Sequence, residues 1–210
     1  SMKEHETILD DDIKLIRIDK FSQSKLSFIK YFFRFWSQKE CLDELEDIKK
    51  NPKMILRKLI KSIEYYARAE FFYDNIVKSN IIDPNAEGVY YSYWYNERVL
   101  GMAMHRDNHP NLKVVTRAHG FDLYDERIDV IQRQPFKNVI DSKLDKVVFI
   151  SKHGHDYYVN KYTKDGQTLD KYKIWRIGVR QQVENISTEK HTPFLLVSCS
   201  MLKKIKRVDY

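Results

Sequence analysis

Four short apolar runs, each separated from the next by a segment long enough for a helix, follow one another along the second half of the chain. They are "VYYSYW" at 89–94, "LKVVTRAH" at 112–119, "DKVVFIS" at 145–151 and "YKIWRIGV" at 172–179. Strands that alternate with helices pair in parallel, because a parallel connection needs the length of a crossover helix. The alternation therefore predicts an α/β fold with a parallel sheet and helices on both of its faces.

The first 80 residues carry mainly helical patterns. Aromatic residues at helical spacing in "KFSQSKLSFIKYFFRFW" predict a helix within 20–36. Asn51 and Pro52 suit the N-cap and the first position of a long helix that runs to about Ser79. Another helix is expected to begin near Asn96, and "IKLIRI" at 13–18 has the pattern of a strand.

Composition limits the class of protein. No run reaches the roughly 18 apolar residues of a membrane span, and the charged N-terminal segment is unlike a secretory signal. Cys41 and Cys199 are far apart and form no disulfide framework, so a reducing compartment, the cytoplasm, is expected. The net charge of +7 and the pI near 9.1 favour anionic partners, which include nucleic acid, phosphate-bearing substrates and an acidic membrane surface.

The C-terminal segment predicts a second, incomplete domain. Residues 180–192 are polar and aperiodic, as in a linker, and "PFLLVSCSMLKKIKRVDY" reads as a strand followed by a basic turn. We therefore expect one α/β domain over 1–180, and over 181–210 a linker with the first strand of a truncated domain. An apolar strand without partners invites association, so this strand should pack back on the first domain or form a homodimer.

The order of these motifs resembles glycosyltransferase family 4, which has the GT-B architecture. The resemblance spans roughly 50–210 and rests on "YYSYW", "VVTRAHGFDLYDER", "DKVVFISKHGHDYYVNKY", "KIWRIGV" and "LLVSCSMLKKIKRVD" in this sequence order. It implies two Rossmann-like domains, of which this chain holds most of the acceptor-binding one. It also implies a retaining transfer of sugar from a nucleotide-sugar donor to a saccharide or lipid-linked acceptor in bacterial surface glycan synthesis, with no cofactor and no obligatory metal.

The resemblance assigns the strand end at 117–120 to the cleft. His119 matches a histidine that contacts the donor sugar or the acceptor, and we take it as the catalytic-site residue. Gly120 would let the backbone approach the ligand closely. Arg117 could bind a phosphate or carboxylate, although an ion pair with Asp122 or Asp125 explains it equally well. Asp122 fits the N-cap of the next helix.

Four further residues are candidate donor or acceptor contacts under the same resemblance. Trp94 follows a strand and offers an aromatic face to a sugar ring, as a core tryptophan also could. Ser151 follows the strand at 145–151, and Gly178 matches a glycine before the interdomain linker. Lys206 matches a lysine that holds the sugar-nucleotide diphosphate, while Met201 stands where the family has an arginine.

The other histidines and the basic charge have alternative explanations. His153 with His155, and His105 with Asp107 and His109, lie on solvated helix or loop segments, so no metal is assigned. A basic nucleic-acid-binding module is the alternative function, but its motifs are absent and the basic residues are mixed with acids. Basic and aromatic residues at 20–70 also suit a peripheral contact with the inner face of a membrane.

Overall fold

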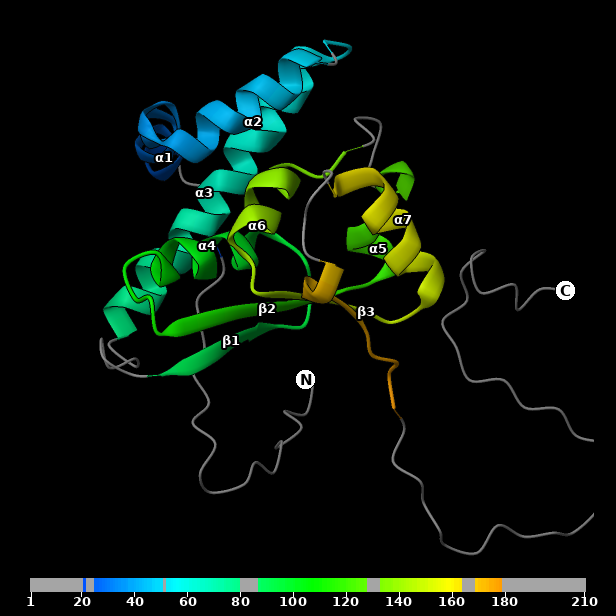
Figure 1. Ribbon diagram of the computed structural model, residues 1–210. Helices are drawn as coiled ribbons and strands as arrows, with labels where there is room; N and C mark the ends of the chain where they lie inside the picture. The colour runs from blue at the N-terminus through cyan, green and yellow to red at the C-terminus, as the bar shows by residue number, and fades with distance from the viewer. Residues whose placement is uncertain are drawn as a thin grey trace, which may run out of the picture. The chain divides into compact units, whose positions relative to one another are not determined.

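A computed structural model describes Phe21 and residues 25–50, 52–79, 87–127, 133–163 and 169–178 (Figure 1). The chain divides into two units, Ser1–Ile177 and Gly178–Tyr210, and of the second only Gly178 is described. Several predictions therefore fall outside the described residues: the strand at 13–18, the linker, the strand after it and Lys206. The predicted packing or homodimer of that last strand falls outside them as well.

A parallel sheet of four strands forms the base of the first unit. The strands are β1 (Gly88–Ser92), β2 (Leu112–Ala118), β3 (Lys146–Phe149) and β4 (Tyr172–Ile174), and they lie in the order β1-β2-β3-β4. Tyr90 lies opposite Val114, and Thr116 lies opposite Val147. The predicted Rossmann-like parallel sheet flanked by helices is thus confirmed. Each strand ends before its apolar run does, so the last residues of each run form the loops at the carboxyl edge.

Short α-helices and 3-10 turns connect the strands. α4 (Glu97–Arg106) joins β1 to β2, and α7 (Lys152–Tyr162) with the 3-10 turn η2 (Leu169–Lys171) joins β3 to β4. Between β2 and β3 lie α5 (Gly120–Leu123), the 3-10 turn η1 (Asp125–Arg127) and α6 (Lys137–Lys143). α4 begins where it was predicted, because the side chain of Asn96 accepts a hydrogen bond from the backbone N–H of Arg98.

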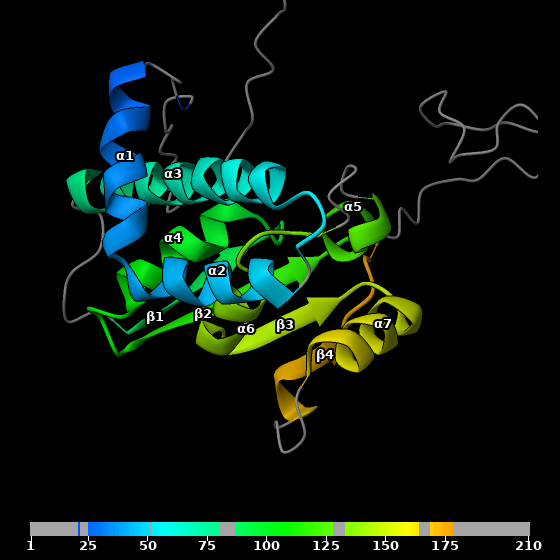
Figure 2. The same ribbon diagram turned by 90° about the horizontal axis from the view of Figure 1, so that it is seen from above.

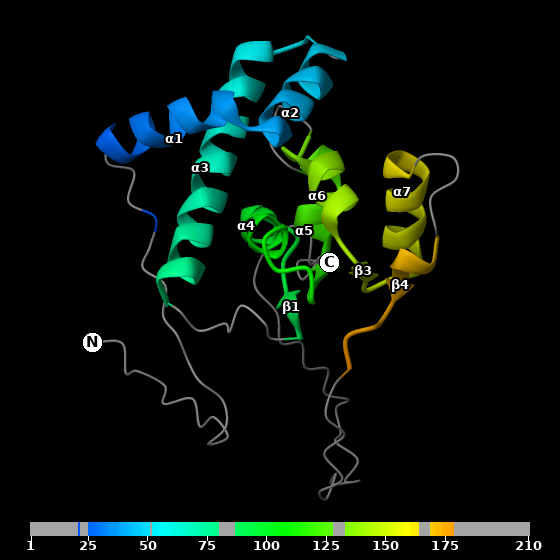
Figure 3. The same cartoon turned by 60° about the vertical axis from the view of Figure 1, so that its left-hand side comes forward.

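The described helices gather on one face of the sheet, whereas the alternating pattern in the sequence led us to expect helices on both faces (Figures 1 and 3). Strands that pair in sequence order with right-handed crossovers return each connecting helix to the same side. Val114, Ala118, Val147 and Phe149 point to this side and are buried. On the opposite face Val89 and Tyr91 of β1 remain 61% and 46% exposed.

Three helices precede the sheet and pack on its helical layer. They are α1 (Lys25–Ser37), α2 (Lys39–Lys50) and α3 (Ile55–Ser79), and Figure 2 shows α1 running across α3. The helices predicted within 20–36 and from Asn51 to Ser79 are both present, although α3 begins at Ile55, after Pro52. α3 packs closely on α4, where a Cβ on Gly101 would lie only 2.7 Å from the carbonyl oxygen of Ala69.

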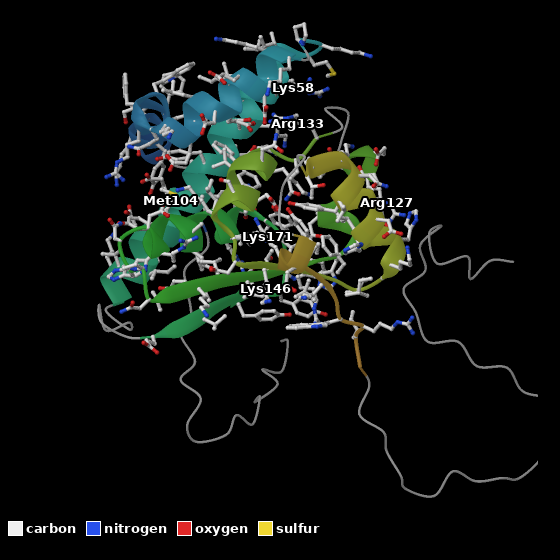
Figure 4. All side chains as sticks on the ribbon, in the orientation of Figure 1. Lys58, Met104, Arg127, Arg133, Lys146 and Lys171 are labelled. Atoms are coloured by element: carbon white, nitrogen blue, oxygen red, sulfur yellow. The ribbon has the colours of Figure 1, made fainter. Side chains whose placement is uncertain are left out.

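A buried carboxylate ties these helices to the sheet domain. Glu44 of α2 accepts hydrogen bonds from both terminal nitrogens of Arg133, which is labelled in Figure 4, at 2.7 and 2.6 Å. It also accepts from the hydroxyl of Ser62 on α3. It also accepts from the backbone N–H of Phe136, which adopts a left-handed conformation with φ of 58°. Removing one partner of such a buried pair costs about 3–5 kcal/mol.

Candidate functional site

An open pocket of about 640 Å³ lies where the carboxyl ends of β1 and β2 meet the middle of α3. We call it the aromatic pocket. It is lined by residues of α3, of the β1–α4 loop, of α5 and of the segment before α6: Lys61, Glu64, Tyr65, Arg68, Trp94, Asn96, Glu97, Phe121, Asp122, Gln134 and Pro135. Its volume is within the range of small-molecule sites.

Two aromatic side chains dominate the surface of this pocket. Trp94 follows β1 and is 44% exposed, while Phe121 on α5 is 73% exposed. Both side chains line the same pocket, so both are accessible to a molecule that enters it. Exposed flat rings at a pocket wall suit the apolar face of a ring-shaped ligand.

His119 lies behind Trp94. Its ring is 4.4 Å from that of Trp94 and 4.6 Å from that of Tyr93, centroid to centroid. Its Nε2 donates to the backbone carbonyl of Tyr93 at 2.9 Å, and the residue is buried. The structure therefore brings His119 to the predicted strand end, but packed against the pocket's tryptophan and not among the lining residues.

Asp122 joins the two strand ends. Its carboxylate accepts from the backbone N–H of Tyr95 at 2.7 Å and of His119 at 2.5 Å. Burial raises the pKa of this carboxyl, while the two backbone donors and Lys137 act in the opposite direction. The expectation that Asp122 is the N-cap is wrong, because the helix begins earlier: His119 is the N-cap of α5 and Asp122 is the third residue inside it.

Arg117 and Gly120 lie close to the pocket in sequence but are not among its lining residues. Arg117 points to the sheet face opposite the described helices, where its guanidinium lies 5.8 Å from the ring centroid of Tyr93. The alternative ion pair with Asp122 or Asp125 is not formed in the described part of the chain. Gly120 begins α5, and the nearest atom to a Cβ there would be the flexible end of Arg127 at 2.8 Å.

Ser151 and Gly178 lie at other strand ends. Ser151 is the N-cap of α7, and its hydroxyl accepts from the backbone N–H of Gly154 at 3.2 Å. Gly178 is exposed beyond β4, with no atom within 4 Å of a Cβ built on it. Of the sequence candidates that fall within the described residues, only Trp94 lies in the wall of the aromatic pocket.

A buried lysine supports the floor beneath this site. Lys137 of α6 donates to the backbone carbonyl of Asp122 at 2.7 Å and to the side-chain oxygen of Gln134 at 2.8 Å. Its Nζ also lies 4.8 Å from the ring centroid of Tyr95. Burial lowers the pKa of Lys137 to about 8, although the neighbouring carboxylates favour its charged form.

Most of the pocket was not anticipated from the sequence. Lys61, Glu64, Tyr65 and Arg68 recur at helical spacing on α3, a pattern that also describes any solvated helix face. Phe121 directly follows the His-Gly pair, and its position in the sequence suits the first turn of a helix as well as a pocket wall. Neither signal shows that α3 crosses the carboxyl edge of the sheet.

Comparisons with known proteins leave the family undetermined: no family model, curated protein or solved structure matches the chain. None of the helices in the described ranges is both long and apolar enough to cross a lipid bilayer.

Proposed function

We propose that the aromatic pocket binds a saccharide and that this domain is the acceptor-binding half of a sugar-transferring enzyme. The observation that carries the proposal is the pairing of exposed Trp94 and Phe121 in a 640 Å³ pocket at the carboxyl edge of a parallel sheet. Ligands of open α/β sheets bind at this edge, because the loops that follow the strands converge there.

The reaction in this proposal is a retaining transfer from a nucleotide-sugar donor to a saccharide or lipid-linked acceptor. Its support is the resemblance of the strand-end motifs to glycosyltransferase family 4, together with a pocket suited to a sugar ring. The residues expected to hold the donor diphosphate, Lys206 among them, lie outside the described residues. The acceptor side is therefore where the proposal can be tested on this chain.

The test is equilibrium binding of neutral methyl glycosides of glucose, galactose and mannose, followed by ligand-observed NMR. We expect at least one to bind, and Trp94→Ala to weaken it about fivefold to tenfold, because stacking on an aromatic ring is lost. Trp36→Ala is the matched control, since Trp36 on α1 is also 44% exposed but lies outside the pocket.

Two results would count against the proposal. If none of the glycosides binds, the pocket is not a saccharide site. If Trp36→Ala weakens binding as much as Trp94→Ala does, the saccharide binds elsewhere. Transfer is measured separately, as acceptor-dependent release of nucleoside diphosphate from UDP- and GDP-sugars. We expect the full-length protein to catalyse it and this chain to show little or none, because the diphosphate site would belong mainly to the second domain.

We further propose a peripheral membrane contact through the start of α3. Met54, Ile55, Leu56 and Ile60 are exposed there, and Leu56 is 67% exposed. Lys53 and Arg57 are exposed among them. Apolar side chains interleaved with basic ones suit an anionic lipid surface, since burial in the interface and attraction to the headgroups act together.

A further inference from the structure

The charges around the aromatic pocket are unevenly compensated. Its two basic residues are both paired with Glu64: Arg68 at 2.9 Å and Lys61 at 3.7 Å. Asp122 is held by two backbone N–H groups. The pocket therefore presents no basic side chain that lacks an acidic neighbour.

Glu97 is the exception among the lining carboxylates. It opens α4, is partly buried, and has no hydrogen-bond or ion-pair partner in the described part of the chain. Its charge reaches the neighbouring phenol: burial raises the pKa of Tyr65 strongly, and the charge of Glu97 adds to this effect. Glu97 therefore presents to the pocket a carboxylate that no cation of the described residues pairs with, although the N-terminal end of α4 favours its charge.

We infer that the aromatic pocket selects an uncharged sugar ring against an anionic one, and that Glu97 determines this specificity. The inference rests on the proposed saccharide function. A carboxylate can accept hydrogen bonds from two neighbouring hydroxyl groups of a ring that stacks on Trp94. An acidic sugar would instead bring a second negative charge into a partly desolvated site. Both basic residues that line this site are already paired with Glu64.

The experiment compares two probes that differ in one group, methyl glucoside and methyl glucuronide. For the wild-type chain we expect the glucoside to bind about tenfold more tightly, and the difference to shrink as salt is added. Glu97→Gln keeps the size of the side chain and removes its charge. This variant should bind the glucoside about threefold to tenfold more weakly, because charge-assisted hydrogen bonds are lost. It should bind the glucuronide more tightly, because the repulsion between two carboxylates is removed.

Glu46→Gln is the matched control, because Glu46 is exposed on α2 and outside the pocket; it should change neither affinity. Opposite movement of the two affinities in Glu97→Gln is a change that general loss of folding cannot produce. If the glycosides bind in a Trp94-dependent manner but Glu97→Gln leaves the preference unchanged, this inference is wrong and the proposed function stands. If no glycoside binds to the wild-type chain, both are wrong.

Discussion

His119 shows how a single residue can shape the pocket without lining it. Its ring is confined between Tyr93 and Trp94, and its Nε2 is bound to the carbonyl of Tyr93. A side chain held in this way fixes the orientation of the tryptophan that forms the pocket wall. We therefore regard His119 as a positioning residue in the proposed site, whereas the resemblance alone implies a direct contact with substrate.

His119→Ala separates these two roles. We expect it to lower the free energy of unfolding by about 1–2 kcal/mol, because packing and a hydrogen bond are lost, and to weaken glycoside binding as Trp94 gains freedom. Urea unfolding and the glycoside titration measure the two effects. His153→Ala, an exposed histidine on α7, is the control. Unchanged stability together with lost binding would favour the direct contact.

Lys137 makes stability depend on pH in a defined window. Below about pH 8 the amine of Lys137 is charged in both the folded and the unfolded state. Above about pH 8 the folded state loses this proton, whereas the unfolded chain keeps it until roughly pH 10.4. At Lys137 the unfolded state then binds more protons, so this residue should raise the free energy of unfolding by about 1–2 kcal/mol between about pH 7.5 and pH 9.5. The Cys41 thiol acts in the opposite direction over the same range, because burial raises its pKa.

Urea unfolding of the wild type and of Lys137→Met across this range tests the prediction: the difference between their free energies of unfolding should change by about 1–2 kcal/mol, because Cys41 contributes equally to both. Measurements stop near pH 9.5 because the buried tyrosines act in the opposite direction above roughly pH 10. Burial raises the pKa of Tyr95 and Tyr158, so the folded state keeps protons there that the unfolded chain releases. A difference that stays constant with pH would mean that the ammonium of Lys137 is not lost in the folded state.

The close crossing of helices α3 and α4 positions the aromatic pocket. Gly101 permits this approach, because a Cβ there would meet backbone, the carbonyl oxygen of Ala69 at 2.7 Å. Gly154 on α7 offers a comparison: the nearest atom to its Cβ would be the end of the Leu123 side chain at 2.8 Å. A side chain can turn away from a new methyl group, whereas a helix backbone cannot.

Gly101→Ala and Gly154→Ala should therefore differ although the substitution is the same. Both gain up to about 1 kcal/mol of helix propensity. We expect Gly101→Ala to be destabilising by about 1–3 kcal/mol overall, as over-packed sites are, and Gly154→Ala to be close to neutral. The midpoints of chemical unfolding give the comparison, and equal midpoints would show that α3 can move away from α4.

Element by element, the sequence was informative where a local pattern decides the structure. Period and length identified the strands and the long helices, and the cap at Asn96 needs only its own side chain. The sequence alone did not place the N-cap of α5, because an aspartate near a helix start can be either the cap or an acceptor at the third helical position. Asp122 has the second role. Phe121 and Tyr65 were missed because their meeting depends on how α3 crosses the sheet edge, which no local pattern encodes.

The start of α3 is the region through which the molecule is expected to contact lipid. We expect the chain to float with liposomes that contain anionic lipid at low salt, and Leu56→Ser with Ile60→Ser to reduce flotation strongly, because exposed apolar area is lost. Val77→Ser is the control, since Val77 is exposed on the same helix about 30 Å away. Failure of the wild-type chain to float, or equal loss with the control, would contradict the proposed contact.

The layer arrangement could be predicted only in part. Alternating patterns indicate a parallel sheet with helices, but the side on which each helix lies depends on the order of the strands. That order is a property of the assembled sheet, and the residues that contribute to it, such as Val114 opposite Tyr90, carry no mark of their partner. The apolar runs alone suit burial on both faces, yet Val89 and Tyr91 are exposed.

The pairing of strands in chain order has a consequence for synthesis on the ribosome. Each strand that emerges finds the strand it must join already made, so the sheet can grow by one β–α unit at a time. Glu44 is different, because its partners Arg133 and Phe136 follow about 90 residues later. Until those residues leave the ribosome, the carboxylate of Glu44 has Ser62 but lacks its arginine, so it must stay partly hydrated. Docking of α2 should therefore be a late event in the nascent chain, after β1 and β2 have paired.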